Sequence, residues 1–414
     1  MVGRKNTIPR LQSPRRPPRG AICAVLLIVA LLAGVATASA DMRIQGELDT
    51  FTQLVWTGAE LGLLGHTRGE LDFLSPRRAA VQARLQLRAT LGEQQTAAGV
   101  AAERSDLLEV PRASLRFRFP LSEDYSMRVT AGRDRLTWGI GSLFNAADLL
   151  FGADGTSAAD FSATDDVRDE TTWLASFYFP MGALSYLETV ALPRLAEPQF
   201  SAGGDAGEGS AANGNDGTGA APAADTRAGL RLHTRLAGVT IEPAYLYDGR
   251  EGHHDLALAL QGGWGADLYA TVRLRLDADI PADPASVAGE RSTLSGGIYY
   301  SFDVAADRTL TGRLETLVAP GASWENRSNP EAEYAILLYP ELVYAPGRTV
   351  NLIGRSVVSP IDHSALITGG VSWNVFQGFR ALAFAAVQVG DQRSVYGWDR
   401  PGSFALSTGF NYRF

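Results

Sequence analysis

The chain has 414 residues, of which 45 % are apolar and one is cysteine. This apolar content excludes intrinsic disorder and predicts a globular or membrane protein. Six of the 37 Lys and Arg residues lie in the first twenty positions, so the rest of the chain carries 31 basic groups, all arginine, against 45 acidic ones. The resulting net charge of about −14 argues against nucleic-acid binding, which requires a basic face.

The first forty residues, 1–40, have the organisation of a cleaved secretory signal peptide. A basic stretch precedes an apolar run, Ala21–Ala36, which is followed by the small-residue triplet Ala38-Ser39-Ala40. A retained membrane anchor is the alternative, but the run is shorter than the ~20 residues that a spanning helix needs. Because Cys23 is the only cysteine, the mature chain, 41–414, is expected to be a single domain without disulfides or thiolate metal sites.

After residue 40 the hydrophobic pattern has a period of two. From Val81 to Leu91, apolar residues alternate without a fault with Gln, Arg and Thr, an order that helical spacing would break within one turn. Comparable segments recur, each of about ten residues, which is the length of a tilted strand that crosses a bilayer. We predict eighteen strands: 42–56, 66–74, 78–91, 107–119, 124–137, 168–179, 183–192, 226–236, 238–248, 254–263, 266–278, 291–303, 307–318, 331–345, 348–359, 363–375, 379–390 and 402–414.

The arrangement of these strands predicts an all-β fold, a transmembrane antiparallel up-and-down β-barrel. The strand number is even, with 16 as the alternative to 18, and short turns alternate with longer loops, notably 138–167 and 193–225. A secreted water-soluble β domain would also alternate. However, one face of the strands is too rich in Arg, Thr, Ser and Gln to form a dry core. Lipid outside and water inside account for both faces.

The last predicted strand ends the chain on an aromatic residue. Its apolar face consists of Phe404, Leu406, Thr408, Phe410, Tyr412 and Phe414. This strand resembles the terminal signature of Gram-negative outer-membrane proteins. The resemblance implies an outer-membrane location among lipid and lipopolysaccharide, and recognition of Phe414 by the barrel-assembly machinery.

A second resemblance lies between the fifth and sixth predicted strands. The segments Gly132–Gly139 and Phe144–Asp148 resemble the G-R-Q-x-x-x-W-G segment and the following N-P-x-D loop of large porin-like channels, among them alginate-export-like proteins. Asp134 stands where those proteins have Gln, and Ala146 where they have Pro. The resemblance implies an outer-membrane channel and says little about its solute.

The inward faces of the strands carry many arginines. A barrel of ~18 strands encloses a water-accessible lumen unless loops fill it, and guanidinium groups bind carboxylate or phosphate in a bidentate manner. The pattern therefore predicts a passive channel for small or oligomeric anionic solutes. A general or sugar-type porin, whose arginines pair with inward carboxylates, is the alternative. The arginines expected along the solute path are Arg84, Arg88, Arg112, Arg116, Arg118, Arg128, Arg231, Arg273 and Arg313.

The loop 138–167 concentrates acidic residues. If it folds into the lumen, it faces the arginines and creates a transverse field at a constriction, whereas a solvated outer loop is the alternative. The acids expected at such a constriction are Asp148, Asp154, Asp160, Asp165 and Asp166.

Residues suited to catalysis or metal binding are scarce. The chain has five histidines and no G-x-S-x-G, H-E-x-x-H or cysteine cluster, so we expect neither an enzyme nor a cofactor or metal. Strand pattern begins within a few residues of Asp41, which leaves no room for the plug domain of an energised receptor. A non-conducting scaffold or adhesin barrel is a further alternative, and an oligomer is compatible with the pattern.

Overall fold

The computed structural model describes residues 42–56, 61–76, 80–95, 102–104, 107–156, 168, 170–193, 199–201, 226–277, 289–325, 334–398 and 402–414. The chain divides into two units, Met1–Met42 and Arg43–Phe414, and the second contains all the strands. The predicted signal peptide, 1–40, and most of the predicted loop 193–225 lie outside the described residues.

Eighteen strands form a closed barrel, which confirms the predicted count and rules out 16. The two further strands, β4 (Ala102–Arg104) and β9 (Gln199–Ser201), pair only with the loop ends of β3 and β5. The barrel strands are β1 (Arg43–Trp56), β2 (Leu61–Leu74), β3 (Val81–Gln95), β5 (Leu107–Pro120), β6 (Ser126–Asp134), β7 (Thr172–Pro180), β8 (Ser185–Leu192), β10 (Arg227–Leu236), β11 (Val239–Asp248), β12 (His253–Gly263), β13 (Asp267–Leu276), β14 (Ser292–Ala305), β15 (Arg308–Val318), β16 (Ile336–Ala345), β17 (Val350–Ser359), β18 (Ser364–Phe376), β19 (Phe379–Val389) and β20 (Phe404–Arg413).

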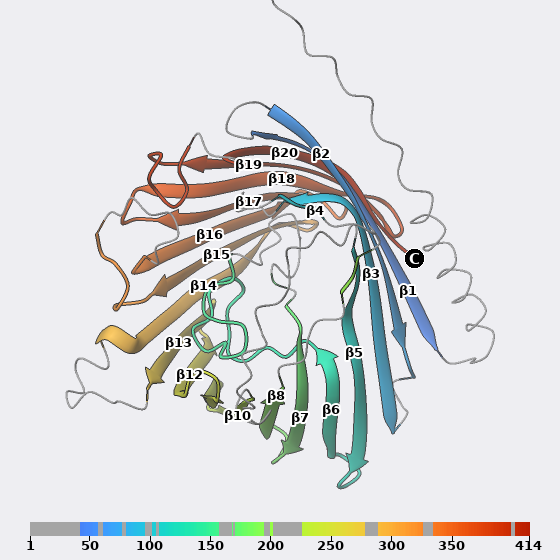
Figure 1. Cartoon of the computed structure of the whole chain (residues 1–414), viewed down its shortest axis with the longest axis vertical. Coiled ribbons are helices and arrows are strands. Elements are labelled where there is room, and N and C mark those ends of the chain that lie inside the picture. Colours follow the sequence, from blue (N-terminus) through green and yellow to red (C-terminus); the bar gives the residue numbers. More distant parts are fainter. Residues whose placement is uncertain are drawn as a thin grey trace, which may run out of the picture. The chain divides into compact units, whose positions relative to one another are not determined.

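Each barrel strand pairs with its neighbours in antiparallel register, as Figure 1 shows. The ring closes where β1 meets β20, with Glu47 opposite Arg413 and Val55 opposite Ala405. Phe414 extends this ladder, because its N–H and C=O each bond to Gly46 over 2.9 Å. Closure leaves no strand edge and pairs the strand backbones with one another, which is the condition for a β structure in lipid.

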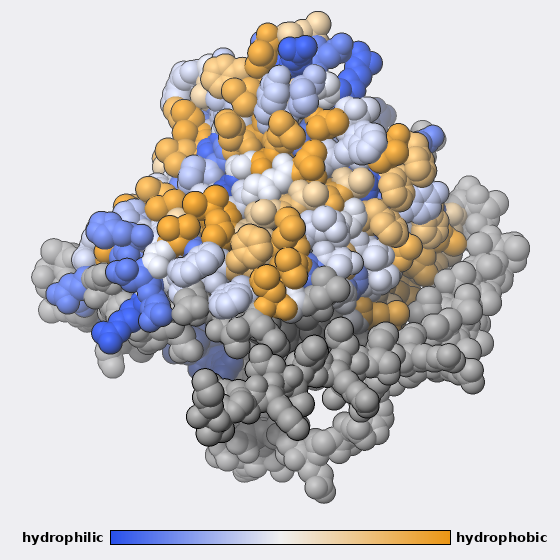
Figure 2. Space-filling model, turned by 90° about the horizontal axis from the view of Figure 1, so that it is seen from above, coloured by the Kyte–Doolittle hydropathy of each residue, from blue (hydrophilic) through white to orange (hydrophobic). Residues whose placement is uncertain are grey.

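The two faces of the barrel wall differ sharply in polarity. On β15, the outward Leu314 is 46 % exposed, whereas its neighbour Glu315 points inward and is 1 % exposed. Ile298 and Leu256 lie on the same outer face, and apolar side chains cover much of the described surface seen in Figure 2. Apolar outside and polar inside is the pattern of a transmembrane barrel. No helix in the described part of the chain is long and apolar enough to cross a membrane.

The chain between β6 and β7 turns into the barrel, and we call residues 135–156 the inserted segment. Its apolar side chains pack against inward faces in two buried clusters. Trp138, Leu149 and Leu150 join residues of β7, β8, β11 and β12. Leu143 and Phe144 join residues of β15 to β18. Part of the interior is therefore packed with apolar side chains, which differs from the open polar lumen expected, because some inward positions here carry residues such as Leu246 and Val357 beside buried polar ones such as Glu315.

Candidate functional site

The middle of the inserted segment, residues 142–146, is held by β14 and β15. The carboxylate of Glu315 accepts hydrogen bonds from the backbone N–H groups of Ser142, Leu143 and Phe144, each over 2.9 Å. The hydroxyl of Ser295 on β14 accepts a further bond from the N–H of Ala146 over 2.9 Å. Three backbone donors and Arg313, whose Nε lies 3.9 Å from the carboxylate, together stabilise this buried charge. These bonds fix the segment across the interior, well away from β6 where it starts.

The parts of the segment on either side of its middle, at Trp138 and at Leu149 and Leu150, are held by β8 and β10. Trp138 is fully buried and donates its indole N–H to Glu188 over 3.2 Å. Gly229 on β10 makes room for this ring, because a Cβ there would lie 2.8 Å from it. Arg227 on β10 donates to the backbone carbonyls of the segment at Leu149 and Leu150. Side chains of the barrel wall thus anchor the segment at Trp138, at residues 142–146 and at Leu149 and Leu150.

The acid Asp148 is used inside the inserted segment. It is 3 % exposed, accepts hydrogen bonds from the N–H groups of Leu150 and Phe151, and lies 3.5 Å from Arg168. Burial raises the pKa of Asp148 to about 6, against the lowering effect of Arg168. Arg168 also binds Glu170 over 2.7 Å.

The other acids predicted for a constriction are placed as follows. Asp154 bridges to Phe144 and accepts a bond from the N–H of Thr156 over 2.9 Å. Asp160, Asp165 and Asp166 lie outside the described residues. The transverse field expected from these five acids therefore stays a prediction.

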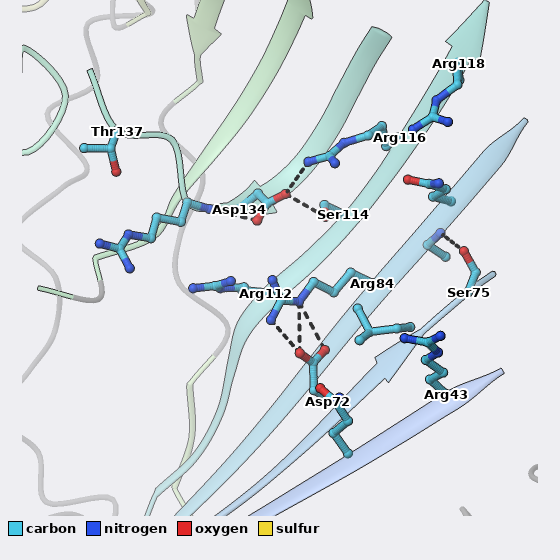
Figure 3. Close-up of a pocket in the computed structure, with 15 residues that line it drawn as sticks. Arg43, Asp72, Ser75, Arg84, Arg112, Ser114, Arg116, Arg118, Asp134 and Thr137 are labelled. Carbon is cyan, nitrogen blue, oxygen red and sulfur yellow. Dashed lines mark hydrogen bonds and ion pairs between the residues drawn. The ribbon is translucent and has the colours of Figure 1, made fainter. Parts of the chain in front are cut away.

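A cavity of about 710 Å³ lies along the opposite wall, against β1, β2, β3, β5 and the start of the inserted segment. Six arginines and two aspartates line it. Figure 3 shows that Arg84 turns to Asp72, while Asp134 lies between Ser114 and Arg116. The lining arginines are Arg43, Arg84, Arg112, Arg116, Arg118 and Arg135.

A smaller cavity of about 80 Å³ adjoins the first. It shares Arg116, Asp134 and Arg135 with it and adds Arg128 and Tyr178. The arginine-rich side of the lumen therefore continues from β5 onto β6 and β7. All nine arginines of the predicted path lie on the inward phase of their strands, but only some of them line these cavities.

Several of the predicted path arginines pair closely with carboxylates across or along the strands. Such pairs are neutralised locally and hold the wall in register. They are Arg84 with Asp72 at 2.5 Å, Arg88 with Glu70 at 3.0 Å, Arg231 with Glu188 at 2.9 Å, Arg273 with Asp255 at 2.8 Å and Arg313 with Glu341 at 3.4 Å.

Arg116 and Arg128, on β5 and β6, have weaker or non-ionic partners. Arg116 lies 4.0 Å from Asp134, whose carboxylate also accepts a bond from Ser114 over 3.1 Å. Arg128 stacks over the ring of Tyr178, with its guanidinium carbon 3.7 Å from the ring centre. Arg116 and Arg128 thus both lie where β5 pairs with β6.

Several wall residues were absent from the sequence prediction. Arg43 and Arg135 line the larger cavity, and Glu70, Asp72 and Glu188 supply partners for path arginines. The alternation does place these residues on inward faces. For Glu70 and Asp72 the signal was weakened by the short predicted strand 66–74, which in the structure begins at Leu61. Among the described residues, no group of His, Cys, Asp and Glu is arranged to hold a metal ion.

Comparison of the sequence with protein-family models and with curated proteins gives no match. Solved structures do match. A BenF-like porin from Pseudomonas fluorescens Pf-5 has a TM-score of 0.53 at 11 % identity, covering 91 % of this chain and 99 % of that one. OccAB4 from Acinetobacter baumannii has 0.52 at 8 %, covering 91 % and 98 %. OpdK from Pseudomonas aeruginosa, in a structure with vanillate, has 0.51 at 10 %, covering 90 % and 98 %. The chain therefore has the 18-strand barrel fold of outer-membrane porins.

Proposed function

We propose that the protein is a passive channel in the outer membrane of a Gram-negative bacterium, through which small anionic solutes diffuse. The observation that carries this proposal is the larger cavity, where six arginines face two aspartates. A confined surface with excess positive charge raises the local concentration of anions and speeds their entry. The porin-type fold supports the channel itself, and the resemblance of Gly132–Gly139 to alginate-export-like proteins stays a prediction.

The inserted segment supports a selective rather than a wide channel. It fills the side of the barrel next to β8, β11, β12 and β15 to β18 with apolar residues. Both cavities lie along the wall that carries Arg116, Arg118 and Arg128. Solutes that cross along this wall would pass these guanidinium groups at close range.

A general or sugar-type porin is the second candidate, favoured by the ion pairs. Arg84, Arg231 and Arg273 each have a carboxylate partner within 3 Å, so these cations serve the wall more than the solute. A sealed, non-conducting scaffold barrel is the third outcome, since apolar residues already fill part of the interior.

Liposome swelling distinguishes these candidates. With solutes of matched size, we expect gluconate to enter faster than glucose, and glucose faster than glucosamine; vanillate is a second anionic probe. The triple variant Arg43→Gln, Arg118→Gln, Arg128→Gln should abolish this order without loss of the barrel. Arg348→Gln is the control, because Arg348 is exposed in a short turn outside the cavities. Equal rates of entry for all three solutes favour the sugar-type porin. Absence of swelling with every solute contradicts a channel.

A further inference from the structure

Two arginines occupy opposite positions where β5 pairs with β6. Arg118 and Arg128 are directly opposite in the antiparallel register and point into the barrel. Among the residues that the structure describes, no carboxylate pairs with either of them. Directly opposed like charges destabilise an antiparallel pair. The pairing of β5 with β6 is therefore destabilised at this position. At Arg84 and Arg273 a neighbouring carboxylate offsets the charge.

Arg116 extends this pair into a cluster of three, which we call the guanidinium triad. It precedes Arg118 by two residues on the same inward face and lines both cavities. Its Nε donates to the hydroxyl of Thr130 over 3.4 Å, and its nearest carboxylate, Asp134, lies at 4.0 Å. The triad thus brings three cations against one carboxylate at the limit of ion-pair distance.

Aromatic rings fix one member of the triad. Tyr178 on β7 lies directly opposite Arg128 in register. The guanidinium carbon of Arg128 lies over its ring, 3.7 Å from the ring centre. Next to it, the ring of Tyr186 lies tilted by 35° against that of Tyr178 with ring centres 4.7 Å apart, and His233 stacks on Tyr186 at 4.7 Å. A guanidinium held by its flat face keeps its N–H edges available for an oxyanion. Tyr178 is therefore a positioning residue for Arg128.

We propose that the guanidinium triad binds the phosphate group of a solute, as inorganic phosphate or a phosphate monoester, and forms a saturable site inside the lumen. This inference rests on the proposed channel function and names its preferred solute class. A phosphate monoester carries about −1.5 to −2 charges at pH 7 and three terminal oxygens, which matches three guanidinium groups. A monocarboxylate offers a single bidentate edge and one charge.

The test is block of chloride current by inorganic phosphate at pH 8, measured on purified protein in a planar bilayer. We expect phosphate to reduce the current saturably and succinate, a dicarboxylate of equal charge, to need a concentration about tenfold higher. Arg118→Gln and Arg128→Gln should each raise the half-blocking phosphate concentration by about tenfold. Arg348→Gln, which removes a charge from an exposed turn outside both cavities, should change it by less than about twofold.

The positioning role of Tyr178 has its own readout. Tyr178→Leu removes the ring under Arg128 and should raise the half-blocking concentration of phosphate while both arginines remain. Tyr178→Phe keeps the ring and should restore wild-type block. Equal block in the Leu and Phe variants contradicts the positioning role.

Failure of the site and failure of the channel give different results. An anion-selective channel that phosphate does not block, or blocks equally in the two arginine variants, overturns the site and leaves the channel proposal standing. Cation selectivity or absence of conductance overturns the channel proposal. Calorimetric titration of the detergent-solubilised protein with phosphate then decides the site alone: binding that both arginine variants lose supports it, and absence of binding overturns it.

Discussion

Asp148 is the single residue whose ionisation acts most directly on the inserted segment. Burial raises its pKa to about 6 from the ordinary 3.8, with Arg168 opposing and Glu170 adding to the rise. Between these two pH values the folded state binds more protons than the unfolded state. The free energy of unfolding therefore falls as pH rises through this window, by roughly 3 kcal/mol for this group.

We predict a pH-dependent stability that the variant Asp148→Asn lacks. The wild-type protein should melt at a higher temperature at pH 4.5 than at pH 7, relative to the Asn variant, because Asn cannot ionise yet still accepts the bonds from Leu150 and Phe151. Thermal unfolding followed by circular dichroism across pH 4 to 8 checks this. A difference between the two proteins that does not change with pH contradicts the raised pKa.

Alternation in the sequence predicts which face each residue occupies, but not its partner. Arg231 was expected to point inward, and it does. Its partner Glu188 lies 43 positions earlier in the chain, on a strand whose register depends on the intervening loop. A one-residue slip would move every partner to the other face. This is why the sequence places the arginines on the inward faces but does not say which carboxylate each one pairs with.

At the scale of the elements, Glu315 is one of the side chains that hold the inserted segment. The variant Glu315→Gln keeps the shape of the side chain but removes the charge that three backbone N–H groups share. We expect a loss of about 2–4 kcal/mol in the anchoring of the segment, and hence faster hydrogen exchange at Ser142, Leu143 and Phe144 and a larger, noisier single-channel conductance.

The matched control for Glu315 is Glu325→Gln. Glu325 is exposed in the loop between β15 and β16, so the same chemical change should leave conductance and exchange unaltered. Unchanged exchange in Glu315→Gln would show that the apolar clusters, and not this carboxylate, hold the segment.

The loop 138–167 could be predicted from the sequence, whereas its anchorage could not. Its charged and aromatic composition allowed both an inward and a solvated position. Glu315 lies more than 170 residues away in the chain, and nothing in the alternation of β15 marks it as a backbone acceptor. Gly229, which leaves space for Trp138, likewise has no local signal.

At the scale of the whole molecule, the eighteen strands were predictable because lipid and water impose opposite polarity on successive residues. All eighteen predicted segments coincide with barrel strands, including the weak one at 66–74. The partly filled interior was not predictable, since inward alanines and leucines on β11 and β12 look the same whether they face a lumen or a packed segment.

The end of the chain leads to a prediction about assembly. Phe414 completes the ladder to Gly46, and we expect the barrel-assembly machinery to read it. Phe414→Ser should lower the amount of folded barrel in outer membranes while refolding in detergent stays close to wild type. Phe410→Ser, a change on the same outward face within β20, is the control. Equal membrane levels for both variants would contradict a terminal signal.

The central claim is that solutes cross this barrel along a wall with excess positive charge. The zero-current potential of the purified protein in a planar bilayer, measured across a potassium chloride gradient, tests it most directly. We predict a potential of the sign set by chloride, reduced in the triple variant Arg43→Gln, Arg118→Gln, Arg128→Gln. A potential of the sign set by potassium, or one that the triple variant leaves unchanged, would contradict the account.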